Sequence, residues 1–151
     1  MTTDNITIAP FLTAFFEAYR VGRPATELGR ITYLDALLRR CLEAASDRID
    51  CDECEAAIAI ERVFNPVDPF ASTMRLDKLL QVLGAFVHSP WLRSDAAMQA
   101  AQWRLVREIV DVLEVDPFVV SLGFEELIVW LRDHIDQGLR RTSQRRSPRD
   151  R

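Results

Sequence analysis

The spacing of apolar residues is the feature that most constrains this chain, because it follows a helical period almost everywhere. Apolar side chains recur three and four residues apart along the sequence, and no long stretch alternates between apolar and polar residues as a half-buried strand does. Gly and Pro interrupt the pattern at intervals, where Gly permits tight turns and Pro removes a backbone donor. The sequence therefore predicts an all-α fold.

The interruptions divide the chain into about six helices joined by short links. We expect helices over residues 8–21, 27–45, 50–64, 74–87, 95–114 and 124–137, with Gly138 as the stop signal of the last. The breaks between them fall at 22–24, 65–69, 88–90 and 116–123. Since 151 residues fit one domain and suffice to bury a core, we expect a compact single-domain bundle over residues 1–138.

Charge is distributed unevenly along the chain, whose formal net charge is −4. Residues 139–151 carry six Arg and one acid, a net charge of +5, whereas residues 1–138 carry a net charge of −9. An acidic body repels the phosphate backbone of nucleic acids, so contact with nucleic acid is expected only through the Arg-rich end. We expect residues 139–151 to form a flexible, solvated C-terminal tail.

The sequence gives no sign of a membrane segment or of a secretory signal. Its unbroken apolar runs are short, such as residues 127–131, whereas a bilayer span needs about 20 predominantly apolar residues. No Lys or Arg precedes Arg20, so the positive start of a signal peptide is missing. Three cysteines cannot all pair and do not make a disulfide scaffold. We therefore expect a reducing, cytoplasmic location and no membrane partner.

One cysteine pair, Cys51 and Cys54, has the C-x-x-C spacing of redox and zinc sites. Four acids flank these thiols, and negative charge disfavours the thiolate that such chemistry needs. Cys41 lies within the apolar stripe of its helix, where a small buried hydrophobe is expected. Core packing of Cys41 and Cys54, without a bound metal, is the favoured interpretation, and a zinc or redox role is the alternative.

Catalytic patterns are missing from the sequence. Neither His88 nor His134 has a Ser, a Cys or a second His at helical spacing to form a nucleophile or base arrangement. The chain contains no H-E-x-x-H, no Walker loop and no G-x-G-x-x-G. Adjacent acids on a helix point to different sides, which is typical of solvated charge rather than of a paired catalytic site. We expect neither an enzyme nor a cofactor.

One aromatic residue of the last predicted helix lies outside the stripe that faces the core. The core stripe of this helix consists of Phe124, Leu127, Ile128, Leu131 and Ile135. Trp130 lies nearly opposite this stripe, on an acidic face with Val129, Glu126 and Asp133. Either another segment covers Trp130, or it anchors an interface, where Trp is enriched among energetic hot spots. We predict that these four residues form part of a subunit or partner interface.

These observations favour a non-enzymatic helical module that binds another protein, as a regulator, an adaptor or an inhibitor. The acidic body favours a basic protein partner, and a second copy of the chain is also a candidate. One alternative is a transcription regulator that contacts DNA through its Arg-rich tail, although no basic recognition helix is evident. The other is a zinc- or thiol-dependent protein that uses Cys41, Cys51 and Cys54.

Overall fold

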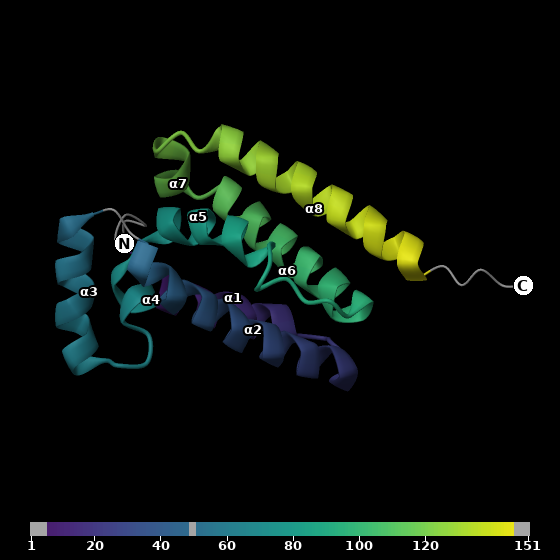
Figure 1. The fold of residues 1–151 in the computed structure, drawn as a ribbon, viewed down its shortest axis with the longest axis horizontal. Coiled ribbons are helices and arrows are strands. Elements are labelled where there is room, and N and C mark those ends of the chain that lie inside the picture. The colour runs from purple at the N-terminus through teal and green to yellow at the C-terminus, as the bar shows by residue number, and fades with distance from the viewer. Residues whose placement is uncertain (1–5, 49–50, 147–151) are drawn as a thin grey trace, which may run out of the picture. The chain divides into compact units, whose positions relative to one another are not determined.

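The computed structural model describes residues 6–48 and 51–146, and this part of the chain is all-α, as the sequence predicts (Figure 1). Its helices are α1 (Ile8–Arg20), α2 (Ala25–Ala45), the short 3₁₀ helix η2 (Ser46–Arg48), α3 (Asp52–Phe64), α4 (Pro69–Thr73), α5 (Leu76–Phe86), α6 (Ala96–Glu114), α7 (Pro117–Ser121) and α8 (Glu125–Arg146). The described residues include no strand, only an isolated antiparallel bridge between Thr7 and Arg75. The α-helices in this part of the chain number eight rather than about six, because α4 begins at the end of the break predicted at 65–69 and α7 forms within the break predicted at 116–123.

Short helices begin and end where the predicted signals lie. Pro69 and Pro117 each occupy the first turn of a five-residue helix, where a missing N–H costs nothing. Gly22 and Gly123 lie in two of the predicted breaks, and both have positive φ angles, of 74° and 72°. These angles favour Gly because a side chain would clash with the backbone there. Helix starts differ in places by two residues: α2 begins at Ala25 rather than near residue 27, and α5 begins at Leu76 rather than near residue 74.

The contacts between helices divide the chain into two units, and the division falls within α5. The N-terminal unit is Met1–Val82, and the C-terminal unit is Leu83–Arg151. In the N-terminal unit, α4 packs against α1, α2 and α3, and α1 packs against α2. Its core includes Ile8, Leu12, Phe16, Ile31, Leu34, Leu38, Cys41, Leu42, Phe70 and Leu79. In α2 the helical period is thus a good guide to burial. In α1 the apolar arc is broader than the buried side, because Phe11, Phe15 and Tyr19 are only partly buried.

Two carboxylates of α2 bind neighbouring helices of the N-terminal unit. Asp35 on α2 pairs with Arg20 on α1 at 3.1 Å and with Arg39 on its own helix at 2.7 Å. Glu43, also on α2, accepts hydrogen bonds from the backbone N–H groups of Phe70 and Ala71 at 2.8 and 3.2 Å. Those donors lie in the first turn of α4, where a helix has no partners of its own for them. α2 thus supplies the cap that so short a helix needs.

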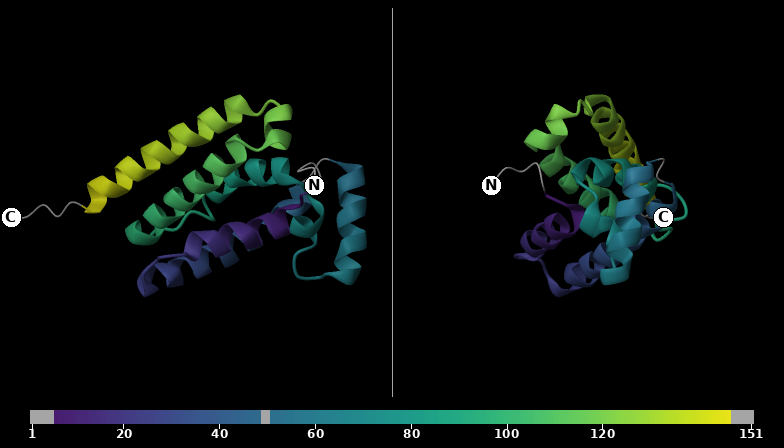
Figure 2. Two further views of the ribbon diagram at one scale, coloured as in Figure 1. Left: turned by 180° about the vertical axis from the view of Figure 1, so that it is seen from behind. Right: turned by 90° about the vertical axis from the view of Figure 1, so that its left-hand side faces the viewer.

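In the C-terminal unit, α6 and α8 run side by side in opposite directions and make the most extensive helix pair (Figure 1 and Figure 2). The predicted stripes supply its core, which includes Leu105, Val106, Ile109, Leu113, Ile128, Leu131 and Ile135. None of the described helices is long and apolar enough to cross a membrane.

The last helix does not stop at Gly138, as the sequence suggested, but continues to Arg146. Residues 139–146, expected in a flexible tail, are therefore helical, and residues 147–151 lie outside the described part. Gly138 has another role. A Cβ atom built on it would overlap three ring atoms of Trp103 on α6, the farthest of them at 2.6 Å. Gly138 is present because α6 and α8 approach closely at this point, not because the helix ends.

A buried amide holds the segment that joins α5 to α6. Gln102 on α6 is fully buried, and its Nε2 donates to the carbonyl oxygens of Phe86 and Trp91 at 2.9 and 3.1 Å. Its Oε1 accepts from the backbone N–H of Arg93 at 3.1 Å. Buried backbone polar groups need such partners, since an unpaired one costs about 1–3 kcal/mol. Gln102 therefore supplies three hydrogen bonds to the end of α5 and to the irregular segment that follows it.

Candidate functional site

The structure brings all four predicted partner-binding residues onto one exposed face of α8. Val129 is 61% exposed and Trp130 is 46% exposed, and Glu126 and Asp133 are also exposed. On the opposite face, Ile128, Leu131 and Ile135 are buried. The helical period therefore separates the two faces as the sequence indicated. The binding role of the exposed face stays a prediction.

Trp130 is partly covered, and the cover consists of aromatic rings of the same unit. Its indole stacks on the imidazole of His134, one turn further along α8, with ring centroids 5.1 Å apart and planes 9° apart. His88, just after α5, stacks on His134 at 4.5 Å and on Trp130 at 5.9 Å. Trp103 and His134 meet in an edge-to-face arrangement, with ring centroids 5.5 Å apart. The sequence left open whether Trp130 is covered or exposed. In the structure, the histidines cover part of the Trp130 ring, and the rest of the side chain is exposed.

The surroundings of the two imidazoles fix the hydrogen position of His88 and the direction in which the pKa of His134 shifts. His88 Nδ1 lies 2.6 Å from the carbonyl oxygen of Gly84, and since a carbonyl only accepts, this nitrogen carries the hydrogen. Burial lowers the pKa of His134, and the neighbouring His88 and Arg141 lower it further. Sequence reasoning gave neither histidine a role, because the two residues are far apart in the chain and share no motif. Only the tertiary fold brings them together.

We expect the stack to make the C-terminal unit sensitive to pH. Because folding lowers the pKa of His134 below its ordinary value of 6.5, the native state favours the neutral imidazole. This contribution to stability is complete above about pH 6.5 and is lost as the pH falls toward the native pKa of His134. An NMR titration of the His134 ring should give a midpoint below 6.5. In the His88→Gln variant the midpoint should rise, since the electrostatic effect of His88 on His134 is removed; an unchanged midpoint would contradict the assignment.

An apolar cavity of about 300 Å³ borders the exposed face at Val129. Its apolar wall consists of Val119, Val120, Phe124 and Ile128. Arg132 closes the polar side, where its guanidinium pairs with Asp111 at 2.7 Å and with Glu114 through two donors. The hydrogen bonds that Arg132 donates to Glu114 and, to a smaller extent, to Asp111 raise the pKa of Arg132. The cavity thus extends the apolar surface of Val129. The positive charge of Arg132 at its polar side is already paired with Asp111 and Glu114.

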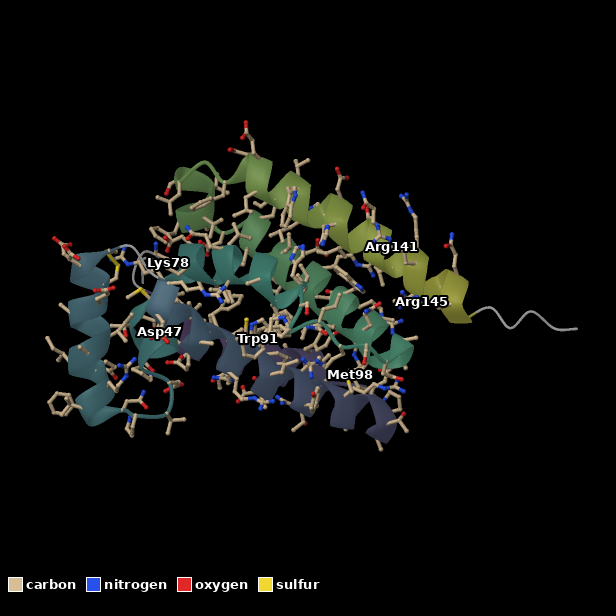
Figure 3. All side chains as sticks on the ribbon, viewed as in Figure 1. Asp47, Lys78, Trp91, Met98, Arg141 and Arg145 are labelled. Carbon is tan, nitrogen blue, oxygen red and sulfur yellow. A yellow bond between two sulfur atoms is a disulfide. The ribbon has the colours of Figure 1, made fainter. Side chains whose placement is uncertain are left out.

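Charge changes sign along α8. Glu125, Glu126, Asp133 and Asp136 lie in its first two thirds. Exposed arginines follow at 140, 141 and 145, and Figure 3 labels Arg141 and Arg145 on the last turns of the helix. The Arg-rich segment is therefore in large part a helical continuation of the candidate face.

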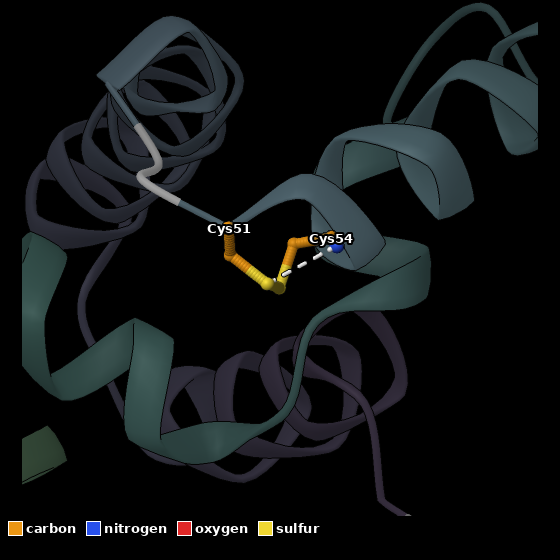
Figure 4. The surroundings of a disulfide bond; sticks show 2 residues. All are labelled: Cys51 and Cys54. Carbon is orange, nitrogen blue, oxygen red and sulfur yellow. Dashed lines mark hydrogen bonds between the residues drawn. A yellow bond between two sulfur atoms is a disulfide. The ribbon is translucent and has the colours of Figure 1, made fainter.

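The cysteines lie in the N-terminal unit and divide into one buried thiol and one pair. Cys41 is 2% exposed, as predicted, and burial raises its pKa to about 12, which makes it inert as a nucleophile. Cys51 and Cys54 form a disulfide across the first turn of α3, with Cα atoms 5.2 Å apart (Figure 4). Cys51 Sγ also accepts a hydrogen bond from the Cys54 N–H at 3.2 Å. Cys54 is half-buried rather than fully packed in the core.

The described residues contain no group of three or more His, Cys, Asp or Glu side chains placed to hold a metal ion. Comparison of the chain with models of protein families, with curated proteins and with solved structures finds no match.

Proposed function

We propose that the protein is a helical protein–protein interaction module and that the exposed face of α8 around Trp130 is its binding surface. The observation that carries this proposal is the stack of Trp130 on His134 and His88, which leaves 46% of the Trp130 side chain exposed. A large aromatic side chain that is held in one orientation loses little freedom on binding. Trp residues of this kind dominate the energetics of interfaces.

The surroundings of Trp130 favour a partner with a basic group and an apolar side chain. Glu126 and Asp133 lie on the same exposed face, one turn to either side of the indole. A Lys or Arg of the partner would meet these carboxylates and the edge of the Trp130 ring. The cavity beside Val129 offers space for an apolar side chain of the partner. Because the charged groups are exposed, salt should weaken the association.

The test is photo-crosslinking from position 129 in the living cell, followed by affinity measurements. A photoreactive amino acid in place of Val129 should give a discrete crosslinked product, identified by mass spectrometry as another protein or as a second copy. The matched control has the same amino acid in place of Val115, which is 75% exposed and lies in the same unit but not on α8. Equal yields of the same product from both positions would contradict the proposal.

Trp130→Ala should weaken binding of the crosslinked partner roughly 30-fold, since hot-spot truncations cost about 2 kcal/mol or more. Thermal unfolding should change little, because nearly half of the side chain is already in solvent. Binding is measured by titration calorimetry, and unfolding by circular dichroism. Unchanged affinity together with a large loss of stability would mean that Trp130 only packs on the histidines.

A further inference from the structure

The N-terminal unit leaves the apolar side of one helix in solvent. Ile60, Val63 and Phe64 on α3 are 65%, 78% and 81% exposed, and Val67, just after α3, is 82% exposed. Ile58, on the other side of the same helix, is 3% exposed. A surface helix ordinarily turns its apolar stripe to the core and its polar residues to water. α3 presents apolar residues on both sides.

Ile60, Val63 and Phe64 lie on one side of α3, and Val67 lies three residues beyond the end of the helix; we call these four residues the α3 face. The spacing of Ile60, Val63 and Phe64, which is i, i+3 and i+4, is the one by which helices recognise apolar surfaces of other proteins. Single exposed hydrophobic residues are common, but a contiguous group of large ones marks an interaction surface.

The charges around the α3 face are predominantly negative. Asp52, Glu53 and Glu55 occupy the first turn of α3 and are exposed, and Glu61 lies further along the helix. Arg62 is the one basic residue of α3. A partner that covers the apolar stripe would therefore meet uncompensated carboxylates at the N-terminal end of the helix.

We propose that the α3 face binds a basic amphipathic helix of another protein. The apolar stripe of that helix would cover Ile60, Val63 and Phe64. Its Lys and Arg residues would lie in its last turns, against the acidic first turn of α3. Basic residues are favoured at helix C-termini and acidic residues at N-termini, so this pairing sets the two helices antiparallel. The proposal concerns a surface other than the α8 face and does not rest on the function proposed above.

A second copy of the chain fits the α3 face less well. In a parallel pair of α3 helices, the acidic first turns would lie side by side. In an antiparallel pair, those carboxylates would lie at the C-terminal end of the other helix, where the helix dipole is negative.

The test uses a labelled peptide of about 18 residues, long enough to form a helix. It carries Leu at the spacing of the α3 face, with Lys and Arg in its last two turns. The control peptide has Glu at the Lys and Arg positions. Binding to the full chain, followed by fluorescence anisotropy, should be at least about tenfold stronger for the basic peptide and should weaken with salt. No binding, or equal binding of the two peptides, would overturn the proposal.

Two matched substitutions locate the bound peptide. Val63→Gln removes part of the α3 face without adding charge, and Val21→Gln makes the same change at another residue of this unit that is also 78% exposed. Val63→Gln and Phe64→Gln should each weaken peptide binding about tenfold. Val21→Gln and Trp130→Ala should not weaken it, which separates this surface from the α8 face. Equal losses in the Val63 and Val21 variants would contradict the assignment.

Sedimentation of the chain alone decides about self-association. We expect no dimer that depends on the α3 face. A concentration-dependent dimer that Val63→Gln abolishes and Val21→Gln preserves would show that a second copy occupies the face, and would overturn the proposed basic partner.

Discussion

Replacing Gly138 with Ala should destabilise the protein by about 1–3 kcal/mol, the usual cost of forcing extra volume into a packed core. The expected sign is unusual, because Ala is favoured over Gly by about 1 kcal/mol inside a helix. At this position a Cβ atom would overlap the ring of Trp103, which is only 4% exposed and has no room to move aside. Urea unfolding followed by circular dichroism measures the difference.

Gly29→Ala is the matched control for this experiment. Gly29 also lies inside a helix, α2, but a Cβ atom there would meet nothing within 4 Å. This variant should be stabilised by about 0.4–1 kcal/mol. If both variants gained stability, the close approach of α6 and α8 at Gly138 would be wrong. Combining Gly138→Ala with Trp103→Leu should cost less than the sum of the two single changes, because the smaller side chain removes the overlap.

Gln102→Leu should destabilise the protein by about 3 kcal/mol or more, even though the volume of the side chain is nearly kept. The change removes the three hydrogen bonds that Gln102 makes with the carbonyl groups of Phe86 and Trp91 and with the N–H of Arg93, although the Trp91 carbonyl still accepts from Nε of Arg93. Each buried group left unpaired costs about 1–3 kcal/mol. Gln137→Leu, at an exposed position of α8, should change the free energy of unfolding by less than about 0.5 kcal/mol.

Hydrogen exchange distinguishes this explanation from a general loss of packing. In the Gln102→Leu variant, the amide of Arg93 should exchange much faster than in the unaltered protein, while amides in the middle of α6 keep their relative protection. A small loss of stability with an unchanged Arg93 amide would mean that the segment between α5 and α6 satisfies itself.

The sequence was a good guide wherever burial follows the helical period. In α2, the apolar period places Ile31, Leu34, Leu37, Leu38, Cys41, Leu42 and Ala45 on one stripe, and all of them except Ala45, at the end of the helix, are buried. In α8, the same reasoning separated Leu131 and Ile135 from the exposed Trp130. A single stripe on one helix needs no knowledge of the rest of the fold, which is why the all-α class was predictable.

The features that the sequence did not reveal depend on residues brought together from distant parts of the chain. The stack of His88 on His134 joins the end of α5 to α8, and neither residue has a local signal. Gly138 looked like a helix stop because the same residue type also ends helices, and only the ring of Trp103 distinguishes the two roles. In α3, apolar residues occur on both sides of the helix, so the period alone cannot say that Ile58 is buried while Phe64 is exposed.

The uninterrupted course of α8 fixes the spacing between its differently charged ends. A helix of 22 residues is about 33 Å long, and Trp130 and Arg145 are separated by about 22 Å along its axis. The acidic and the basic ends of α8 are therefore held at a fixed distance by one continuous helix. A rod-like partner that lies along the whole of α8 must carry its own charges in the opposite order at the same spacing. A second α8, turned end for end, has that order.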